Sequence, residues 1–229
     1  MGLRRLLVVP AIGLLLHNVA NALPILTPFI NELHYDNLGT DVDEFIEIAG
    51  SPQSLLGFRL LLYNGGNGTS YRSIPLDITI PDQSNGFGTV ALRVNGLQNG
   101  PADGIALVDP LDQVLDWLSY EGQLLAQNGP ASGLLSHGLD VLQVPSTAPG
   151  LSLQRTGAGF APADFSWVGP VANSPGAINA GQQWLGTSMA IDEPMPMLLL
   201  GLGLILVGLR QYYCRALNCR RRAVSTGSV

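Results

Sequence analysis

The stretch from Ile30 to Gly50 reads INELHYDNLGTDVDEFIEIAG, with an acidic loop between two runs rich in apolar residues. The flanking runs, FINELHY and EFIEIA, have the length and the aromatic and β-branched content typical of strands. Turn-forming Asp, Asn and Gly residues fill the segment between them. The stretch therefore predicts two strands joined as a β-hairpin.

Similar short runs recur between Gly and Pro turn signals, and no long apolar period of 3.6 residues stands out. Some alternate, as in residues 89–94, while others are apolar throughout and suit strands buried on both faces. Many short strands at this spacing favour an immunoglobulin-like sandwich or a barrel. The further runs are FRLLLYN, YRSIPLDITI, GTVALRV, GIALVD, QVLDWLSY, LSLQRT and DFSWV.

Residues 1–22 are predicted to be a secretory signal peptide. Arg4 and Arg5 precede an apolar run over residues 6–16, and Ala20 and Ala22 form a cleavage site of the A-x-A kind. The run rises about 16 Å as a helix, roughly half of a hydrocarbon core. Cleavage after Ala22 is therefore expected, and a buried helix of the fold is the alternative.

The other end of the chain predicts a membrane anchor. A linker over residues 186–194 leads into a transmembrane helix over residues 195–213, and residues 214–229 form a cytoplasmic tail. Arginines flank this span on the side predicted to be cytoplasmic: Arg210, Arg215, Arg220, Arg221 and Arg222. The domain between the two ends, residues 23–185, is expected to lie outside the cytoplasm.

An acidic-proline element, a Gly- and Leu-rich span and an arginine cluster follow one another at this end. Their order resembles the PEP-CTERM sorting signal of Gram-negative bacteria, with Asp192-Glu193-Pro194 in place of the usual Pro-Glu-Pro. The resemblance implies recognition by an exosortase and delivery from the inner membrane and periplasm to the cell surface or an extracellular polysaccharide matrix. An ordinary C-terminal membrane anchor is the alternative.

The charge of the exported body argues against nucleic-acid binding. All seventeen carboxylates but only four arginines lie between residues 23 and 193, a formal charge of −13. Such a surface repels phosphate backbones. Both cysteines, Cys214 and Cys219, lie beyond the predicted membrane span, so the body must fold on its hydrophobic core without a disulfide.

The acidic loop offers oxygen atoms to a calcium ion. Its candidate ligands are Asp36, Asn37, Asp41, Asp43 and Glu44. The spacing is not that of the helix–loop–helix calcium motif, and these residue types also form turns by accepting hydrogen bonds from nearby backbone amides. The turn-forming role is the favoured hypothesis, and no cofactor is required. Asp82, Asp103 and Asp109 lie in other loops and would join a calcium site only if the fold gathered them.

The sequence contains little that is typical of an enzyme. Outside the signal peptide the histidines are His34, expected to be at the surface or half-buried in a strand, and His137, near Ser136 in a loop. No G-x-S-x-G element accompanies them. Trp117, Trp167 and Trp184 fit core packing better than carbohydrate stacking. No catalytic residue is assigned.

Several blocks together resemble the bacterial branch of the lamin-tail domain, over roughly residues 29–182. They are the opening stretch, LLGFRLLLYNGGNG, IPDQSNGFGTVAL, LQNGPADGIALVD, LSYEG and SPGAINAGQ. Residues 44–47, Glu-Phe-Ile-Glu, match the family's second strand, whereas residues 55–58 have Phe where a Trp is usual. The resemblance implies an all-β, immunoglobulin-like fold.

The resemblance also implies a role in binding rather than chemistry. We expect a non-enzymatic envelope module that binds or scaffolds a polysaccharide or a surface protein. A calcium-dependent adhesion module that uses residues 36–44 is the first alternative. A weak envelope hydrolase, or an accessory to one, is the second.

Overall fold

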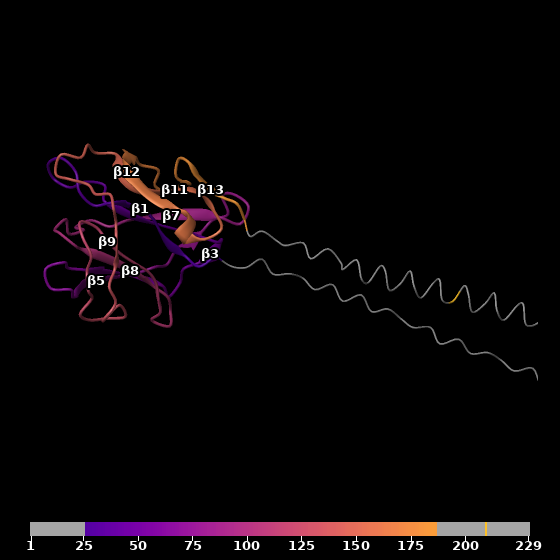
Figure 1. The fold of residues 1–229 in the computed structure, drawn as a ribbon, viewed down its shortest axis with the longest axis horizontal. Coiled ribbons are helices and arrows are strands. Elements are labelled where there is room, and N and C mark those ends of the chain that lie inside the picture. The colour runs from indigo at the N-terminus through magenta and orange to yellow at the C-terminus, as the bar shows by residue number, and fades with distance from the viewer. Residues whose placement is uncertain (1–25, 187–208, 210–229) are drawn as a thin grey trace, which may run out of the picture. The chain divides into compact units, whose positions relative to one another are not determined.

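A computed structural model of the chain describes residues 26–186 and residue 209. The chain divides into a unit of residues 1–187 and a second unit of residues 188–229. The described part of the first unit, residues 26–186, is all-β, and its two main sheets face one another as the layers of a sandwich (Figure 1). The prediction of a β-sandwich is thus confirmed for this unit.

The first sheet contains the hairpin with which the sequence analysis began. Its strands lie in the order β12 (Ser166–Ala172), β11 (Leu151–Gly159), β1 (Phe29–His34), β2 (Phe45–Gly50) and β7 (Gly88–Arg93), and neighbours are antiparallel. A short strand, β13 (Gln182–Trp184), pairs with β11 in parallel. β1 and β2 are buried along their whole length, including the polar residues of both strands.

The second sheet has the order β10 (His137–Gly138), β9 (Val114–Ser119), β8 (Gly104–Val108), β4 (Arg59–Tyr63) and β5 (Ser70–Pro75). A two-stranded pair of β3 (Gln53–Ser54) and β6 (Thr79–Ile80) and a single 3₁₀ turn, η1 (Pro162–Asp164), complete the elements of this unit. The segment at residues 121–141, predicted to be mostly loop with one helical turn, contains no helix.

The main core lies between the two sheets. Ile30, Leu33 and Ile46 of the first sheet meet Leu60 and Leu107 of the second, and all five side chains are fully buried. Burying one such side chain stabilises the fold by roughly 1.5–3 kcal/mol. Alternation of apolar residues along the strands therefore explains why the two sheets stack.

A bulge in β1 changes which residues face away from this core. The register with β2 shifts between Ile30 and Glu32, so Asn31 is the extra residue. Ile30 and Leu33 remain in the core, whereas Asn31 and Glu32 contact polar side chains of other segments. The outer face of β1 consequently becomes polar although it is buried.

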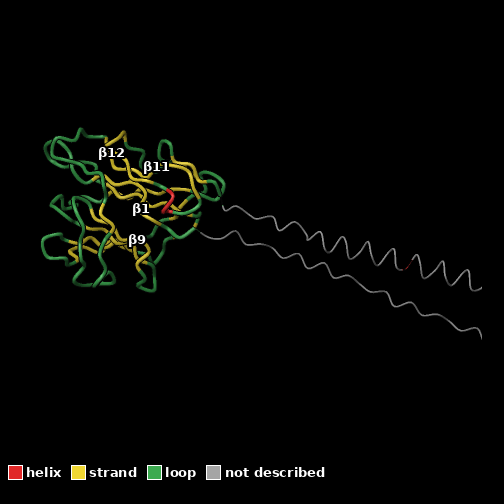
Figure 2. Tube along the Cα trace, viewed as in Figure 1, coloured by secondary structure: helices red, strands yellow, loops and turns green. Residues whose placement is uncertain are grey.

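The described chain enters and leaves the sandwich at the same end. The Leu26 amide donates to Ser51 Oγ at 2.8 Å, and Leu26 packs against an aromatic cluster that contains Phe87 and Trp184. The loop after β1 and the β7–β8 loop lie at the opposite end, away from β3, where loops gather at the left of Figure 2. We call this opposite end the distal tip; it comprises residues 35–44, 64–69, 94–103 and 143–147.

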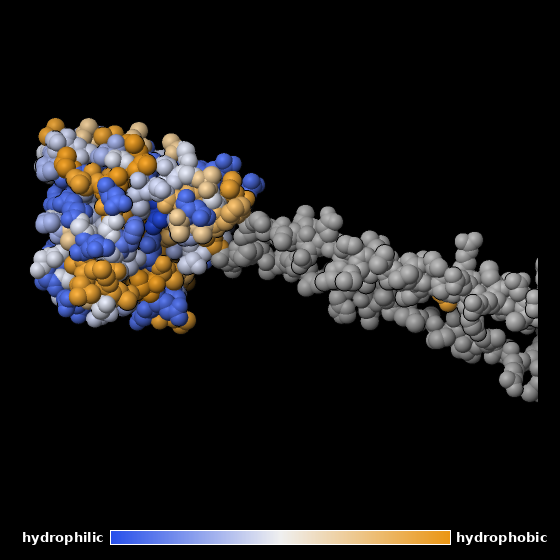
Figure 3. Space-filling model, in the orientation of Figure 1, coloured by the Kyte–Doolittle hydropathy of each residue, from blue (hydrophilic) through white to orange (hydrophobic). Residues whose placement is uncertain are grey.

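Segment 120–136 folds back over the outer face of the second sheet. It encloses a second apolar cluster in which Trp117 packs edge-on against Tyr63, with ring centroids 4.8 Å apart. Leu125, Leu134 and Leu135 stay exposed on this segment. Figure 3 shows hydrophobic residues gathered over the lower sheet of the view.

Candidate functional site

The acidic loop closes on itself through its own side chains. Asn37 Oδ1 accepts a hydrogen bond from the Val42 amide at 3.0 Å, and its Nδ2 donates to the carbonyls of Leu38 and Thr40. Asp41 Oδ1 in turn accepts from the Asn37 amide at 3.2 Å. These contacts are those of a turn stabilised by Asx side chains, and they occupy oxygen atoms that a cation would need.

Glu44 ties this loop to the β7–β8 loop. Its carboxylate accepts from the Gly96 amide at 2.6 Å and the Leu97 amide at 2.8 Å, and the residue is almost fully buried. Burial raises the pKa of Glu44, and the two amide donors oppose that rise. The left-handed backbone at Gly96, with φ of +76°, presents its amide to the carboxylate.

Asp43 and Arg93 form an ion pair at the surface of the distal tip. Their side chains are 65% and 76% exposed, so the pair is available to a ligand but contributes little to stability. An open depression of about 560 Å³ lies on one side, lined by Asp41, Asn95 and the Gly96 backbone among others. A second depression, on the other side of the pair, is lined by Phe45 and Asn173 among others.

The five predicted calcium ligands lie on one loop, but most of them are buried or already interact with other groups of the protein. Asp36 and Asn37 are buried, and Asp41 Oδ2 accepts from Asn99 Nδ2 at 3.2 Å. Burial, followed by repulsion from Asp41, raises the pKa of Asp36. In the part of the chain that the structure describes, no three His, Cys, Asp or Glu side chains gather to hold a metal ion.

The other acidic residues considered for a shared site are dispersed. Asp103 lies at the distal tip, where its carboxylate accepts from the Gly65 and Gly100 amides. Asp82 and Asp109 lie in turns at the other end of the sandwich, where each accepts from backbone amides of its own turn. All three are turn-forming residues in this structure.

The two histidines do not face a nucleophile. His34 is 1% exposed, so the expectation of a surface or half-buried position was wrong. Its ring contacts Gln143 Oε1 and the Val42 carbonyl, because segment 142–147 covers this end of β1. The Ser136 hydroxyl pairs with Ser119 Oγ at 2.5 Å and accepts from the Leu124 amide, away from exposed His137.

A buried polar layer on the outer face of the first sheet was not predicted. It contains Glu32 and Glu47, which are directly opposite on β1 and β2 and are both 0% exposed. Burial raises the pKa of Glu47 to about 8, and repulsion from Glu32 adds to the effect. No local pattern in the two strands indicates this burial, because the residues that cover the two side chains lie more than 100 positions away in the sequence.

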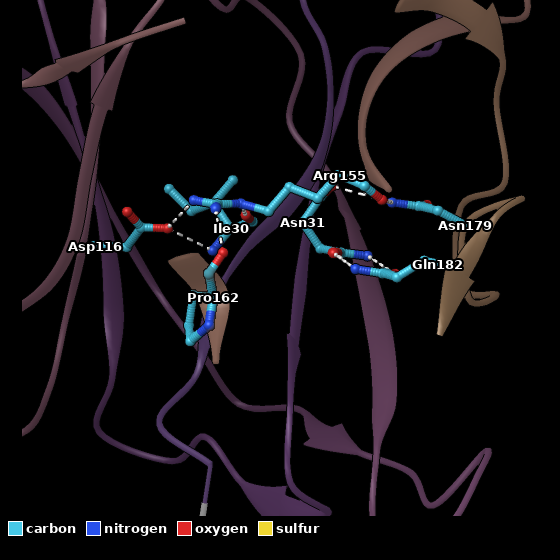
Figure 4. A network of polar contacts seen from close by, with 7 residues as sticks. All are labelled: Ile30, Asn31, Asp116, Arg155, Pro162, Asn179 and Gln182. Atoms are coloured by element: carbon cyan, nitrogen blue, oxygen red, sulfur yellow. Dashed lines mark hydrogen bonds and ion pairs between the residues drawn. The ribbon is translucent and has the colours of Figure 1, made fainter. Parts of the chain in front are cut away.

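A single arginine organises the neighbouring polar network. Arg155 donates from Nε to the Ile30 carbonyl at 2.9 Å and from Nη1 to the Pro162 carbonyl at 3.0 Å, and Nη2 reaches Asp116 Oδ2 (Figure 4). Its guanidinium also lies over the rings of Phe29 and Trp167, at 5.4 and 5.1 Å. Each of the three guanidinium nitrogens makes a contact within the domain, so the network supports the fold.

The tryptophans pack against other side chains. Trp117 and Trp184 are each 8% exposed, and Trp184 stacks on Phe87 with centroids 5.5 Å apart. Trp167 stacks on Arg155. Trp117 and Trp184 are too buried to present an open ring face of the kind that carbohydrate platforms use, and Trp167 is half-buried.

Comparisons with family models, curated proteins and solved structures found no match to this chain. Among the described residues, no helix is long and apolar enough to cross a membrane. The predicted signal peptide with Ala20 and Ala22 and the predicted sorting element Asp192-Glu193-Pro194 lie outside those residues. So do the flanking arginines and, apart from Leu209, the predicted span 195–213.

Proposed function

We propose that this chain is an exported, non-enzymatic binding or scaffolding module of the bacterial cell envelope. Its C-terminal segment tethers it to the inner membrane, with the sandwich in the periplasm, until an exosortase passes it to the surface or the polysaccharide matrix. The observation that supports this proposal best is the shared entry and exit end of the sandwich. A domain tethered there presents its distal tip away from the tether.

The composition of the distal tip supports a binding role. It has exposed aliphatic side chains at Leu38, Val42 and Val144 beside the Asp43–Arg93 pair and the two depressions. Exposed apolar groups beside polar groups are typical of interaction surfaces. The ligand class that we propose is an envelope polysaccharide or a surface protein.

The resemblance to the bacterial lamin-tail domain supports an immunoglobulin-like version of the sandwich. The residues that carry it fall on elements of the structure, since Glu-Phe-Ile-Glu spans the start of β2 and residues 59–63 of the next block form β4. Domains of this family serve as binding or accessory modules, which is the role proposed here.

Two rival functions remain as alternatives. A calcium-dependent adhesion module would use Asp36, Asn37, Asp41, Asp43 and Glu44, of which Asp43 has the most exposed carboxylate for a cation. An envelope hydrolase would use His34 or His137, so replacing either would abolish a measurable turnover in the purified protein. The engaged loop oxygens and the buried position of His34 favour the binding module.

Co-sedimentation with extracted extracellular polysaccharide tests the proposal, and the chain offers a matched control. We expect the double variant Asp43→Asn, Arg93→Gln at the tip to weaken binding about tenfold, which corresponds to about 1.4 kcal/mol. The variant Asp112→Asn, Arg59→Gln removes another surface ion pair at the tether end and should leave binding unchanged. Equal losses in both variants would contradict a binding surface at the tip.

A further inference from the structure

Residues 173–181 cross the outer face of the first sheet between β12 and β13, and we call them the strap. The strap begins where the Asn173 amide donates to the Gly150 carbonyl and ends where the Gly157 amide donates to the Gly181 carbonyl, both at 3.0 Å. Between these points it lies over β1 and β2 and covers their polar outer face. It is also the last segment before β13 and the C-terminal part of the chain.

Two carboxylates accept hydrogen bonds from the strap, which Asn179 also anchors through the Asn31 and Arg155 carbonyls. Glu32 accepts from the Ser174 amide at 2.8 Å and from Ser174 Oγ at 3.0 Å, while Glu47 accepts from the Gly176 amide at 2.7 Å. Both side chains are fully buried, and they occupy directly opposed positions on neighbouring antiparallel strands. Like charges in such positions repel one another.

The other groups that contact Glu32 and Glu47 are uncharged. Glu32 also accepts from Ser152 and Gln154, and Glu47 also accepts from Asn31 Nδ2 at 2.9 Å. The strap, β12 and β13 contain no charged residue. The arginines on the neighbouring strands pair with other carboxylates and not with Glu32 or Glu47. Arg155 of β11 contacts Asp116, and Arg93 of β7 contacts Asp43.

The two carboxylates differ in how many hydrogen bonds they accept. Glu32 receives four, from Ser152, Gln154 and Ser174. Glu47 receives two. A second buried negative charge without a cation is costly, so the closed strap is compatible with one charge and not with two.

We infer that the strap is a pH-dependent clasp, closed while the Glu32–Glu47 pair carries one negative charge and open once both carboxylates are ionised. Opening admits water to the second charge, which removes the desolvation cost. β13 stays paired with β11 on this account, so opening is confined to the strap. The clasp does not rest on the proposed function.

Hydrogen–deuterium exchange of the full-length protein in detergent tests the clasp, with mass spectrometry of peptides that cover the strap. After correction for intrinsic exchange rates, we expect the protection factors of the strap amides to fall by about tenfold or more between about pH 6.5 and pH 9.5. Peptides from β4 and β8 in the second sheet should keep theirs. Unchanged strap protection in the unmodified protein would overturn the proposal.

Variants identify the groups responsible. Glu47→Gln and Glu32→Gln each limit the pair to one charge, so each should keep the strap protected at the higher pH. Glu44→Gln is the matched control, because it changes another buried glutamate of the same hairpin that does not contact the strap. The clasp is contradicted if strap protection still falls in both variants as in the unmodified protein. A variant that fails to fold loses protection in β4 and β8 as well. The test then rests on the change in strap protection with pH in the unmodified protein.

Discussion

Arg155 and Asp116 connect the two sheets of the sandwich. Arg155 belongs to β11 of the first sheet and Asp116 to β9 of the second, and Nη2 lies 3.4 Å from Oδ2. The same Asp116 oxygen accepts from the Ile30 amide at 3.0 Å, while Arg155 Nε donates to the Ile30 carbonyl. The bulge in β1 leaves both backbone groups of Ile30 available for these contacts.

Replacing Arg155 should be severely destabilising. Burial lowers the pKa of Arg155 and raises that of Asp116, so each charge needs the other to offset the cost of its own burial. We expect Arg155→Ala to cost about 3–5 kcal/mol of unfolding free energy, because the Asp116 carboxylate stays buried without its cation. Urea denaturation measures this loss. Arg59→Ala, which breaks an exposed pair, should cost no more than about 1 kcal/mol; similar losses for the two variants would contradict the bridging role.

Stability should fall as the pH rises from about 4.5 to about 8. The unfolded chain releases the Glu47 proton near the ordinary pKa of 4.5, whereas the folded protein holds it to about 8. Within this window the folded state binds more protons, so the free energy of unfolding decreases by up to about 1.4 kcal/mol per pH unit. Raised pKa values of Asp36 and Glu44 act in the same direction.

Urea denaturation at several pH values measures this dependence. Glu47→Gln should reduce the slope, since the amide does not titrate, and other carboxyl groups with raised pKa values, among them Asp116, keep part of it. A stability that stays level or increases across the window in the unmodified protein would contradict the buried, protonated state of Glu47.

The strands were predictable because their side-chain pattern is local. The runs that became β1, β2, β4 and β8 carry enough apolar residues to indicate buried strands without knowledge of any partner. β13 was missed because three residues, Gln182–Trp184, become a strand only through parallel pairing with β11, more than twenty positions away. Neither its length nor its composition is typical of a strand.

Glu44 should be important for the stability of the distal tip. Its two backbone donors, the Gly96 and Leu97 amides, lose their acceptor in Glu44→Ala. We expect a loss of about 1–3 kcal/mol, since buried donors are left without a partner. Thermal unfolding followed by circular dichroism measures the change, with exposed Asp43→Asn as the control. A loss in the control equal to that in Glu44→Ala would show that the buried bonds are unimportant.

Calcium should have little effect on the stability of the domain. The loop oxygens of Asn37, Asp41 and Glu44 already accept backbone amides, so a cation must compete with these bonds. We expect millimolar calcium to leave the melting temperature unchanged, because a ligand raises it only by binding the folded state. A rise that Asp41→Asn abolishes would instead favour the calcium-dependent adhesion module.

The candidate site was predictable only in part, because burial of polar groups depends on distant segments. The loop at residues 36–44 was identified from its composition, and its Asx turn follows from local sequence. The burial of His34 depends on Gln143, and that of Glu32 and Glu47 on the strap, more than 100 positions away. No local pattern in β1 or β2 contains that information.

The most direct measurement is the side of the membrane on which the sandwich lies. The two cysteines are replaced in Cys214→Ser and Cys219→Ser, and Asn67→Cys in the exposed β4–β5 loop provides one reactive thiol. A membrane-impermeant maleimide is then applied to intact spheroplasts and to lysed ones. If the sandwich is exported, the cysteine at residue 67 is labelled in intact spheroplasts. The native Cys214 of the unmodified protein is then labelled only after lysis. Labelling of residue 67 only after lysis would contradict export.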